Sequence, residues 1–340
     1  MLTLPPFLLL LLSIPIILFL TPQLLLPKTL TAITTTSDLD ELDDLNLFQR
    51  ATTLSSPDLT SPVSTHKIAF LFLTNSNLTF SPLWDLFFSS HAPLLSVYVH
   101  ADPSSPFLLP PSPSFRLRLI PSKPTARAHP SLISAARRLL AFALLDDPRN
   151  AFFAILSQHC IPLRPFPSLH RALFSPSPSQ SFIEILPPKP SLWPRYIARG
   201  ATAMLPEIPF SRFRVGSQFF ALTRRHASLV VRDRVLWPKF RLPCLPSSKH
   251  SCYPEEHYFP TLLSMMDPKG CTGYTLTRVN WTFIVDGHPH LYSPEEISPE
   301  LVRKLRKSDS GHEFMFARKF SPGCLKPLME IAKSVILKED

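Results

Sequence analysis

The hydrophobic and polar positions of this 340-residue chain fall into three stretches of different texture. Residues 2–27 contain no charged side chain, and residues 29–66 are rich in Thr, Ser, Asp and Pro. From Lys67 onward, short apolar runs alternate with amphipathic segments. Changes of this kind mark candidate domain boundaries. We therefore expect three parts, which comprise residues 1–28, 29–66 and 67–340.

The first part is long and apolar enough to cross a membrane. Residues 7–20 are interrupted only by Ser13 and Pro15, and a spanning helix needs about 20 mostly apolar residues. A cleaved signal peptide is the alternative, but basic residues ahead of the apolar run and an obvious A-x-A site are both missing. We favour an uncleaved membrane anchor. The second part has too few apolar residues to bury a core, which predicts a flexible stem.

The third part reads as alternating strands and helices. Continuous apolar runs are typical of strands that are buried on both faces. Strands are predicted at residues 68–73, 94–100, 116–120 and 152–157. Helices are predicted at residues 83–88, 131–145 and 224–232. This alternation predicts an α/β fold with a largely parallel sheet. Ligands bind at the carboxyl ends of such strands, here near residues 100–102 and 157–158.

Composition narrows the classes of function. The chain has only 7 glycines and 40 prolines, and neither G-x-G-x-x-G nor G-x-x-x-x-G-K-[ST] occurs, which disfavours dinucleotide-binding and P-loop folds. The net charge is +10; residues 1–66 hold two basic and six acidic side chains, so the remainder carries +14. A basic domain suits an anionic partner, such as a phosphorylated small molecule or an acidic membrane surface. Nucleic acid is disfavoured because the cations are scattered and no recognition motif is present.

The cysteines and two N-glycosylation sequons give information about the cellular compartment of the protein. None of the five cysteines forms a C-x-x-C pair, which argues against a zinc site. Cys244 and Cys252 are close enough in sequence to close a small disulfide loop, and the odd count leaves at least one thiol unpaired. Asn77 and Asn280 each begin an N-x-[ST] sequon, and N-glycosylation there fits a lumenal location.

The segment around Glu255, Glu256 and His257 is the first candidate for chemistry. Two adjacent carboxylates and an imidazole stand among aromatic residues and prolines. A carboxylate in such a setting can have its pKa shifted and can act as a general base. The alternative is an acidic first turn of a helix that follows Pro254, and both interpretations can hold together. We expect His257 to be a packed or hydrogen-bonded support rather than a ligand.

Seven short blocks then carry a family resemblance. They are residues 69–74 (AFLFLT), 97–101 (VYVHA), 137–140 (RRLL), 156–157 with 160–163, 216–220 (GSQFF), 255–258 (EEHY) and 316–320 (FARKF). In this order they resemble the plant branch of the core-2/I-branching N-acetylglucosaminyltransferase-like proteins. The resemblance runs from about Lys67 to the C-terminus, and an anchor followed by a stem matches how such enzymes are built.

The resemblance implies a GT-A-like fold with a mixed, largely parallel central sheet, a UDP-sugar donor and a Golgi address. A single-pass type II membrane protein with a lumenal catalytic domain is then expected. The resemblance also implies inverting transfer without the metal-binding D-x-D of many GT-A enzymes. The only D-x-D of this chain is Asp38-Leu39-Asp40, which lies in the expected stem. We therefore expect no metal cofactor.

Matching the family motifs residue by residue assigns the chemistry. Glu256 matches the general base, which would take the proton of an acceptor hydroxyl as that oxygen attacks the anomeric carbon. Lys319 matches a family lysine, and with Arg318 it would stabilise the leaving diphosphate. On a strand the two cations alternate, so one of them could instead be an ordinary surface cation.

The binding residues are assigned in the same way. Val99, His100 and Ala101 match the strand end that lines the nucleotide site, although His100 could simply cap a strand. Glu184 is a looser match to an acceptor-binding carboxylate. Arg195 could bind acceptor or merely stack on an aromatic ring.

The expected reaction moves N-acetylglucosamine or another sugar from a UDP donor to a glycan or glycoprotein. One rival is a catalytically silent lumenal protein that binds carbohydrate or acts as a scaffold, and another is a secreted basic protein with a cleaved leader. Two departures from the family pattern favour the silent rival: Gln158 replaces a glutamate, and a Trp-Gly pair is missing near residues 125–128. Retention of Glu256 and Lys319 favours the enzyme.

Overall fold

The computed structural model describes residues 36–53, 65–176, 179–248, 252–282, 287–308 and 310–339. The expected anchor, residues 1–28, lies outside this set. Among the described residues, no helix combines the length and the apolar character that a membrane crossing requires. The chain divides into two units between Leu45 and Asn46. Helix α2 contains this division, and the arrangement described below is that of the second unit.

Helices and short strands follow one another along the whole second unit. The helices are α2 (Thr36–Thr53), α3 (Ser81–Phe88), α4 (Ser131–Asp146), α5 (Phe166–Phe174), α6 (Trp193–Tyr196), α7 (Arg224–Arg232), α8 (Trp237–Phe240), α9 (Glu255–Met266), α10 (Pro299–Arg306) and α11 (Leu325–Ile331). The strands are β1 (Lys67–Thr74), β2 (Leu95–Ala101), β3 (Asn150–Ser157), β4 (Ile161–Pro162), β5 (Ser181–Glu184), β6 (Ala221–Thr223), β7 (Cys271–Gly273), β8 (Thr277–Val279) and β9 (Phe316–Arg318).

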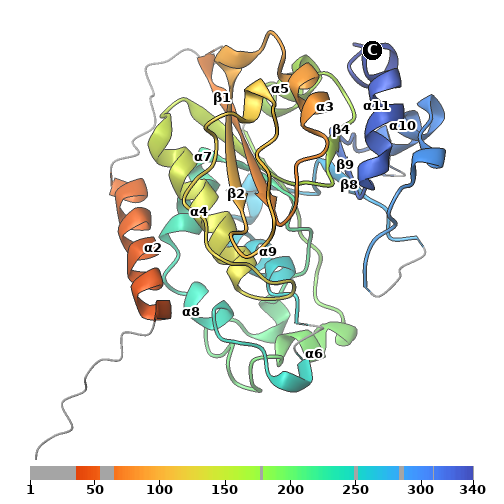
Figure 1. Ribbon diagram of the computed structural model, residues 1–340. Helices are drawn as coiled ribbons and strands as arrows, with labels where there is room; N and C mark the ends of the chain where they lie inside the picture. The colour runs from red at the N-terminus through yellow and green to blue at the C-terminus, as the bar shows by residue number, and fades with distance from the viewer. Residues whose placement is uncertain are drawn as a thin grey trace, which may run out of the picture. The chain divides into compact units, whose positions relative to one another are not determined.

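Six strands form the central sheet in the order β2-β1-β3-β6-β5-β7. The pairs β1–β2, β1–β3 and β5–β7 are parallel, whereas β6 runs antiparallel to both of its neighbours. Figure 1 shows β1 and β2 side by side, with α4 packed along them. The sheet is mixed and largely parallel, and it fits the GT-A fold that the resemblance implied.

Strand β1 shows why the apolar run is continuous. Phe70 and Phe72 belong to the core on one face of the sheet, together with Trp84 of α3. Ala69 and Leu71, which point the opposite way, belong to the core that α4, α7 and α9 form on the other face. Because helices cover both faces, residues 68–72 are all buried and the alternation typical of a half-exposed strand is missing.

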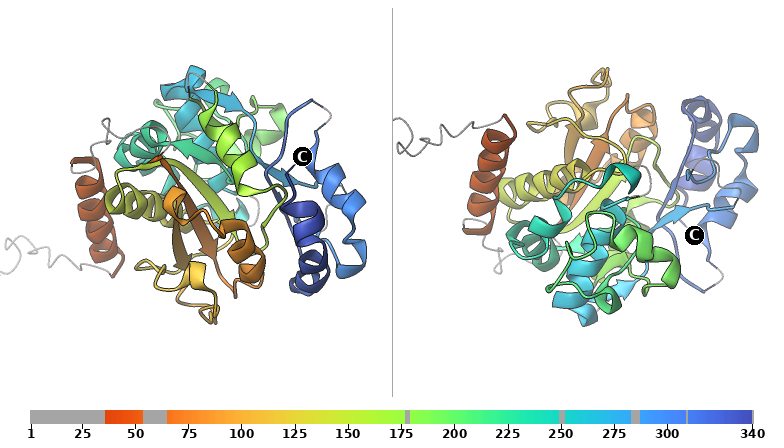
Figure 2. Two further views of the ribbon diagram at one scale, coloured as in Figure 1. Left: turned by 90° about the horizontal axis from the view of Figure 1, so that it is seen from above. Right: turned by 90° about the horizontal axis from the view of Figure 1, so that it is seen from below.

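A smaller sheet, β4-β9-β8, brings the C-terminal region against this core. Phe316 of β9 lies with its ring centroid 5.8 Å from that of Trp84. Arg306, at the end of α10, donates to the carbonyls of Leu163 and Val335 at 2.8 and 2.6 Å. Figure 2 shows α10 and α11, in blue, together beside this sheet. The end of β9 is thereby fixed near the ends of the central strands.

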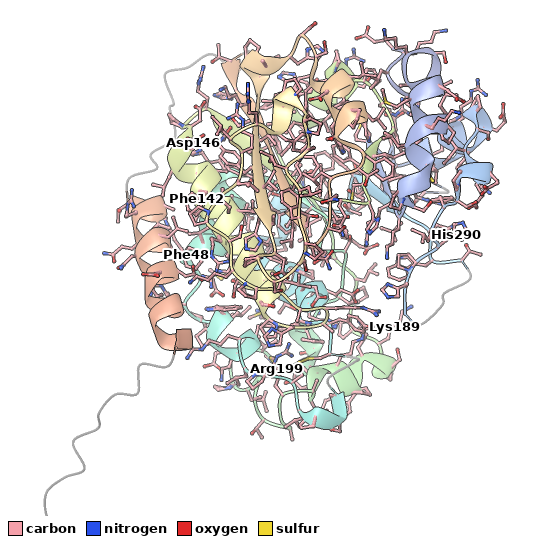
Figure 3. The ribbon with its side chains drawn as sticks, in the orientation of Figure 1. Phe48, Phe142, Asp146, Lys189, Arg199 and His290 are labelled. Carbon is pink, nitrogen blue, oxygen red and sulfur yellow. A yellow bond between two sulfur atoms is a disulfide. The ribbon has the colours of Figure 1, made fainter. Side chains whose placement is uncertain are left out.

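Arg137 of α4 is buried and belongs to the family block at residues 137–140. Its guanidinium donates to the carbonyls of Val230, Val231 and Asp233, at and just beyond the C-terminal end of α7. A cation at that position satisfies carbonyls that have no partner within the helix. The ring of Phe48 lies 4.6 Å from the same guanidinium, and Figure 3 shows Phe48 and Phe142 near each other.

Most predicted elements are confirmed. The apolar runs 68–73, 94–100 and 152–157 are β1, β2 and β3, and the predicted helices are α3, α4 and α7. The strand predicted at residues 116–120 is wrong, because only Leu119 pairs with β2, through Val99. Leu117 is 91% exposed and has a left-handed backbone with φ of 55°, which breaks the extended path.

Part of the expected flexible stem is helical. Residues Thr36–Thr53 form α2, and within the second unit Phe48 and Ala51 of this helix are buried. The average composition of residues 29–66 does not reveal these two apolar positions. They lie three residues apart, on one face of the helix.

Candidate active site

A cavity of about 310 Å³ opens at the carboxyl ends of β1 and β3. Strand ends contribute Thr74, Asn75, Ser157 and Gln158 to its wall. The charged and aromatic residues that line it include Arg127, Tyr253, Glu255, Glu256, Arg318 and Lys319. The cavity thus lies at the end of β3, where the rule for such sheets predicts a ligand site. Residues 100–102, at the end of β2, do not line it.

Glu256 stands in the first turn of α9, which begins directly after Pro254. Its Oε2 lies 2.7 Å from Nη1 of Arg195, and about a quarter of each side chain is exposed. The backbone carbonyl of Glu256 accepts from the N–H of Gly216 at 2.9 Å. The positive end of the helix dipole favours a charged carboxylate at this position. The predicted acidic first turn is confirmed, and it presents Glu256 to the cavity.

Arg195 positions Glu256 in the structure. Its guanidinium lies 4.8 Å from the ring centroid of Tyr253, so the cation stacks on an aromatic face while it holds the carboxylate. Of the two roles considered for Arg195, stacking is therefore observed. An ion pair with Glu256 was not foreseen, because residues 61 positions apart show no pairing signal in sequence.

Glu184 is brought close to Glu256 through the loop at Gly216. The N–H of Ser217 donates to Oε2 of Glu184 at 2.9 Å. Burial raises the pKa of Glu184, and the charge of Glu256 raises it further. A Cβ atom on Gly216 would lie only 1.9 Å from the carbonyl oxygen of Glu184, so this close approach of two backbones requires glycine. The loop at residues 216–217 thus contacts both Glu184 and Glu256 and holds them in place.

His257 is a support and not a ligand, as predicted. It is fully buried, its Nδ1–H donates to the carbonyl of Arg214 at 2.8 Å, and its ring stacks on Phe213 with centroids 4.4 Å apart. Burial lowers its pKa to about 3, so the ring is neutral at physiological pH. The neutral ring fixes the first turn of α9 against the segment that carries Arg214.

Three cations face the cavity. Arg318 ends β9 and places its guanidinium 4.3 Å from the ring centroid of Phe219. Burial lowers the pKa of Arg318, and the charge of Glu256 opposes this shift. The pKa of Lys319 is lowered by burial and then by the charges of Arg318 and Arg127. Arg318 and Lys319 both line the cavity, so the alternative that one of them is only a surface cation is wrong.

Arg127 is the residue that the sequence analysis missed. It comes from the loop between β2 and α4 and donates to the hydroxyl of Tyr253 at 3.0 Å and to the carbonyl of Gly287 at 3.4 Å. The sequence pointed to Arg127 in one way only: it is a basic residue in the loop after a buried strand, and ligands bind at that edge of such a sheet. Trp281, with 49% exposure, and His288 also line the cavity and were not predicted.

The end of β2 shapes the loop that carries Arg127. Val99 and His100 are fully buried and do not line the cavity. Nε2 of His100 accepts from the N–H of Lys123 at 3.3 Å and lies 3.1 Å from Nη1 of Arg138. Ala101, the last residue of β2, is partly buried and does not line the cavity either. His100 thus supports the loop that carries Arg127.

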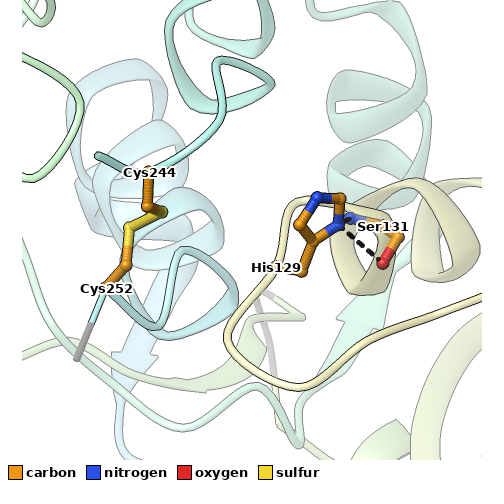
Figure 4. The surroundings of a disulfide bond; sticks show 4 residues. All are labelled: His129, Ser131, Cys244 and Cys252. Carbon is orange, nitrogen blue, oxygen red and sulfur yellow. Dashed lines mark hydrogen bonds between the residues drawn. A yellow bond between two sulfur atoms is a disulfide. The ribbon is translucent and has the colours of Figure 1, made fainter. Parts of the chain in front are cut away.

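The disulfide lies immediately before helix α9, which carries Glu255 and Glu256. Cys244 and Cys252 are bonded, as their spacing suggested, and the other three cysteines are free thiols. Figure 4 shows the disulfide near the loop in which Nδ1 of His129 hydrogen-bonds Ser131. Tyr253, directly after the bridge, has a left-handed backbone with φ of 40°. The bridge thus restrains the entry to α9.

The two sequon asparagines differ in their exposure. Asn77 is exposed, whereas Asn280 is partly buried and its Nδ2 donates to the Tyr292 hydroxyl at 3.2 Å. Within the described parts of the chain, no three His, Cys, Asp or Glu side chains come together as a metal site would require.

Residues 68–306, from the start of β1 to the end of α10, match the family description of core-2/I-branching enzymes. The chain belongs to the core-2/I-branching enzyme family. Among relatives of this core-2/I-branching enzyme is "Glycosyltransferase BC10" of Oryza sativa subsp. japonica, which is 28% identical over 321 residues. The match covers 80% of this chain and 78% of that relative. The present core-2/I-branching enzyme is therefore a glycosyltransferase.

Proposed function

We propose that this core-2/I-branching enzyme is an inverting, metal-independent glycosyltransferase that uses a UDP-sugar, with N-acetylglucosamine as a candidate sugar. One observation carries the proposal: Glu256 faces the same cavity as Arg318, Lys319 and Arg127. A carboxylate that shares a cavity with a group of cations suits a reaction in which the carboxylate removes a proton while the cations stabilise a departing diphosphate.

Glu256 is the general base in this proposal. Its carboxylate takes the proton from an acceptor hydroxyl while that oxygen forms a bond to the anomeric carbon of the donor sugar. The bond between that carbon and the diphosphate oxygen breaks on the opposite face, and the electron pair leaves with UDP. Arg195, 2.7 Å from Oε2, fixes the orientation of the carboxylate. Attack from the opposite face inverts the configuration.

The cations stabilise the departing UDP. Arg318, Lys319 and Arg127 line the cavity, and burial, followed by repulsion from the charges of the other two, lowers the pKa of Lys319. A diphosphate placed among them relieves that mutual repulsion and gains fixed, pre-oriented positive charge. The only D-x-D of the chain, Asp38-Leu39-Asp40, belongs to α2 and not to a strand end of the sheet. Metal-independent transfer is proposed on these two grounds.

The acceptor and the compartment belong to the same proposal. Glu184, beside Glu256, would bind a hydroxyl of a glycan or glycoprotein acceptor. A disulfide and an exposed sequon at Asn77 support a lumenal domain, because disulfides persist in oxidising compartments. We place the protein in the Golgi membrane as a single-pass type II protein anchored by residues 1–28.

A panel of UDP-sugars tests the proposal. The full-length protein, purified in detergent, is incubated with each donor and a mixture of glycan acceptors, with and without EDTA, and released UDP is measured. We expect release from at least one donor at a rate that EDTA leaves unchanged. Strict dependence on a divalent metal would contradict the role of the cations.

A silent carbohydrate-binding protein remains a second candidate because of Gln158. This residue lines the cavity where the resemblance leads us to expect a glutamate, and its Nε2 donates to Oδ1 of Asn75 at 2.7 Å. Binding of UDP without release of UDP from any donor of the panel would favour this candidate.

A further inference from the structure

Glu255 is a buried carboxylate that the proposed reaction does not use. Only 5% of the residue is exposed, yet it lines the cavity beside Glu256. The backbone N–H of Ala128 donates to the carboxylate, whereas Oε2 has no hydrogen-bond partner among the described residues. Buried polar atoms nearly always have a partner, so the carboxylate of this cavity-lining residue keeps hydrogen-bonding capacity that no described residue uses.

A second buried group shows how the protein tolerates this carboxylate. Arg199, 6% exposed, lies over the ring of Phe240 at 5.2 Å, near α8 (Figure 3). Its three side-chain nitrogens make no hydrogen bond to any described residue. The charge of Glu255 nevertheless raises the pKa of Arg199 against the effect of burial. Arg199 and Glu255 therefore interact electrostatically without a hydrogen bond between their side chains.

The backbone around Glu255 places it on the donor side of the cavity. Ala128 belongs to the loop after β2 that also carries Arg127, one of the cations proposed to hold the diphosphate. Ala128 adopts a left-handed conformation with φ of 55°, which is unusual for a residue other than glycine. Glu256, by contrast, pairs with Arg195 of α6. The two adjacent carboxylates are thus held by different elements.

We propose that Glu255 is a specificity-determining residue whose carboxylate accepts a hydrogen bond from an O–H or N–H group of the donor sugar. The inference rests on the proposed function, because it names a contact of the same UDP-sugar. UDP lacks the sugar and cannot make this contact. A carboxylate that binds the sugar distinguishes donors by whether they present a hydrogen-bond donor at that point.

Calorimetric titration with UDP and with UDP-sugars tests the proposal. UDP-glucose, UDP-galactose, UDP-xylose and UDP-N-acetylglucosamine are titrated into the full-length protein, and the tightest binder is carried forward. In Glu255→Ala and Glu255→Gln we expect this UDP-sugar to bind about ten- to hundredfold more weakly, as is typical for loss of a hydrogen bond to a charged group. Binding of UDP is expected to change less than about twofold, which is small beside that loss.

Two controls separate this role from a structural one. Glu300→Gln removes an exposed carboxylate of α10 and should leave both affinities unchanged. Glu255→Asp keeps the charge and should restore part of the lost affinity for the UDP-sugar. A thermal melt of each variant confirms that it is folded.

The other outcomes overturn the proposal. If the Glu255 variants lose the same affinity for UDP and for the UDP-sugar, Glu255 has a structural role. If their affinity for both ligands is unchanged, Glu255 does not contact the donor. A raised acceptor KM with unchanged donor affinity would place Glu255 on the acceptor side. Failure of the natural protein to bind UDP would instead refute the proposed function, so the two failures are distinguishable.

Discussion

Replacing Glu255 by glutamine should stabilise the protein at alkaline pH. Burial raises the pKa of this carboxyl from 4.5 to about 7. A shift of that size corresponds to about 3 kcal/mol between the charged and neutral forms. Glutamine resembles the neutral form and keeps a carbonyl oxygen for the N–H of Ala128, so it avoids the cost of burying the charge.

The sign of the pH dependence follows from proton binding. Between pH 4.5 and 7 the folded protein keeps the Glu255 proton that the unfolded chain has lost, so the free energy of unfolding falls as the pH rises through this window. Glu255→Gln lacks this dependence. Its advantage should approach about 3 kcal/mol at pH 8 and vanish below about pH 4.

Urea unfolding followed by tryptophan fluorescence at pH 5, 6, 7 and 8 measures this difference. Glu300→Gln, on the exposed face of α10, is the matched control and should track the natural protein at every pH. A constant difference across the series, or a less stable Glu255→Gln at pH 8, would refute the reasoning. If the advantage is confirmed, the natural protein keeps a destabilising carboxylate at its cavity, as is common at functional sites.

Three further predictions concern the frame of the site. Gly216→Ala should lower the free energy of unfolding by at least about 2 kcal/mol, measured as a urea midpoint, because its Cβ would lie 1.9 Å from a backbone carbonyl oxygen; an unchanged midpoint would show that the loop can yield. The double variant Cys244→Ser/Cys252→Ser should have a free energy of unfolding about 2–3 kcal/mol lower in the same assay. An unaltered unfolding curve would show that the disulfide does not stabilise the protein. In a eukaryotic secretory host, Asn77→Gln should remove a larger share of endoglycosidase-sensitive mass than Asn280→Gln, because Asn280 is hydrogen-bonded to Tyr292; the reverse order would contradict this assignment.

The elements of the sheet were predictable because burial on both faces leaves an unmistakable apolar run. Residues 68–73 could not be a surface strand, and β1 is covered by two separate cores. The segment 116–120 imitates a strand by alternation alone, but Leu117 leaves the extended path at φ of 55°. Helix α2 was missed because its buried positions Phe48 and Ala51 are diluted by acidic and hydroxyl residues.

The candidate site was predictable only in part, because its contacts join distant segments. The family resemblance placed Glu256, Arg318 and Lys319, and they do face one cavity. Arg127 and the pairing of Arg195 with Glu256 depend on how separate loops converge. Neither spacing nor composition records that convergence. Val99 and His100 were expected to line the nucleotide site but lie beneath the loop that carries Arg127.

The Glu256→Gln variant tests whether Glu256 is the general base. Sugar transfer from the preferred UDP-sugar and the affinity for UDP are measured on the same preparation of natural and variant protein. We expect transfer to fall by about 10²–10⁴-fold, while UDP binds the variant nearly as tightly as the natural protein. Full transfer activity in Glu256→Gln would show that Glu256 is not the base.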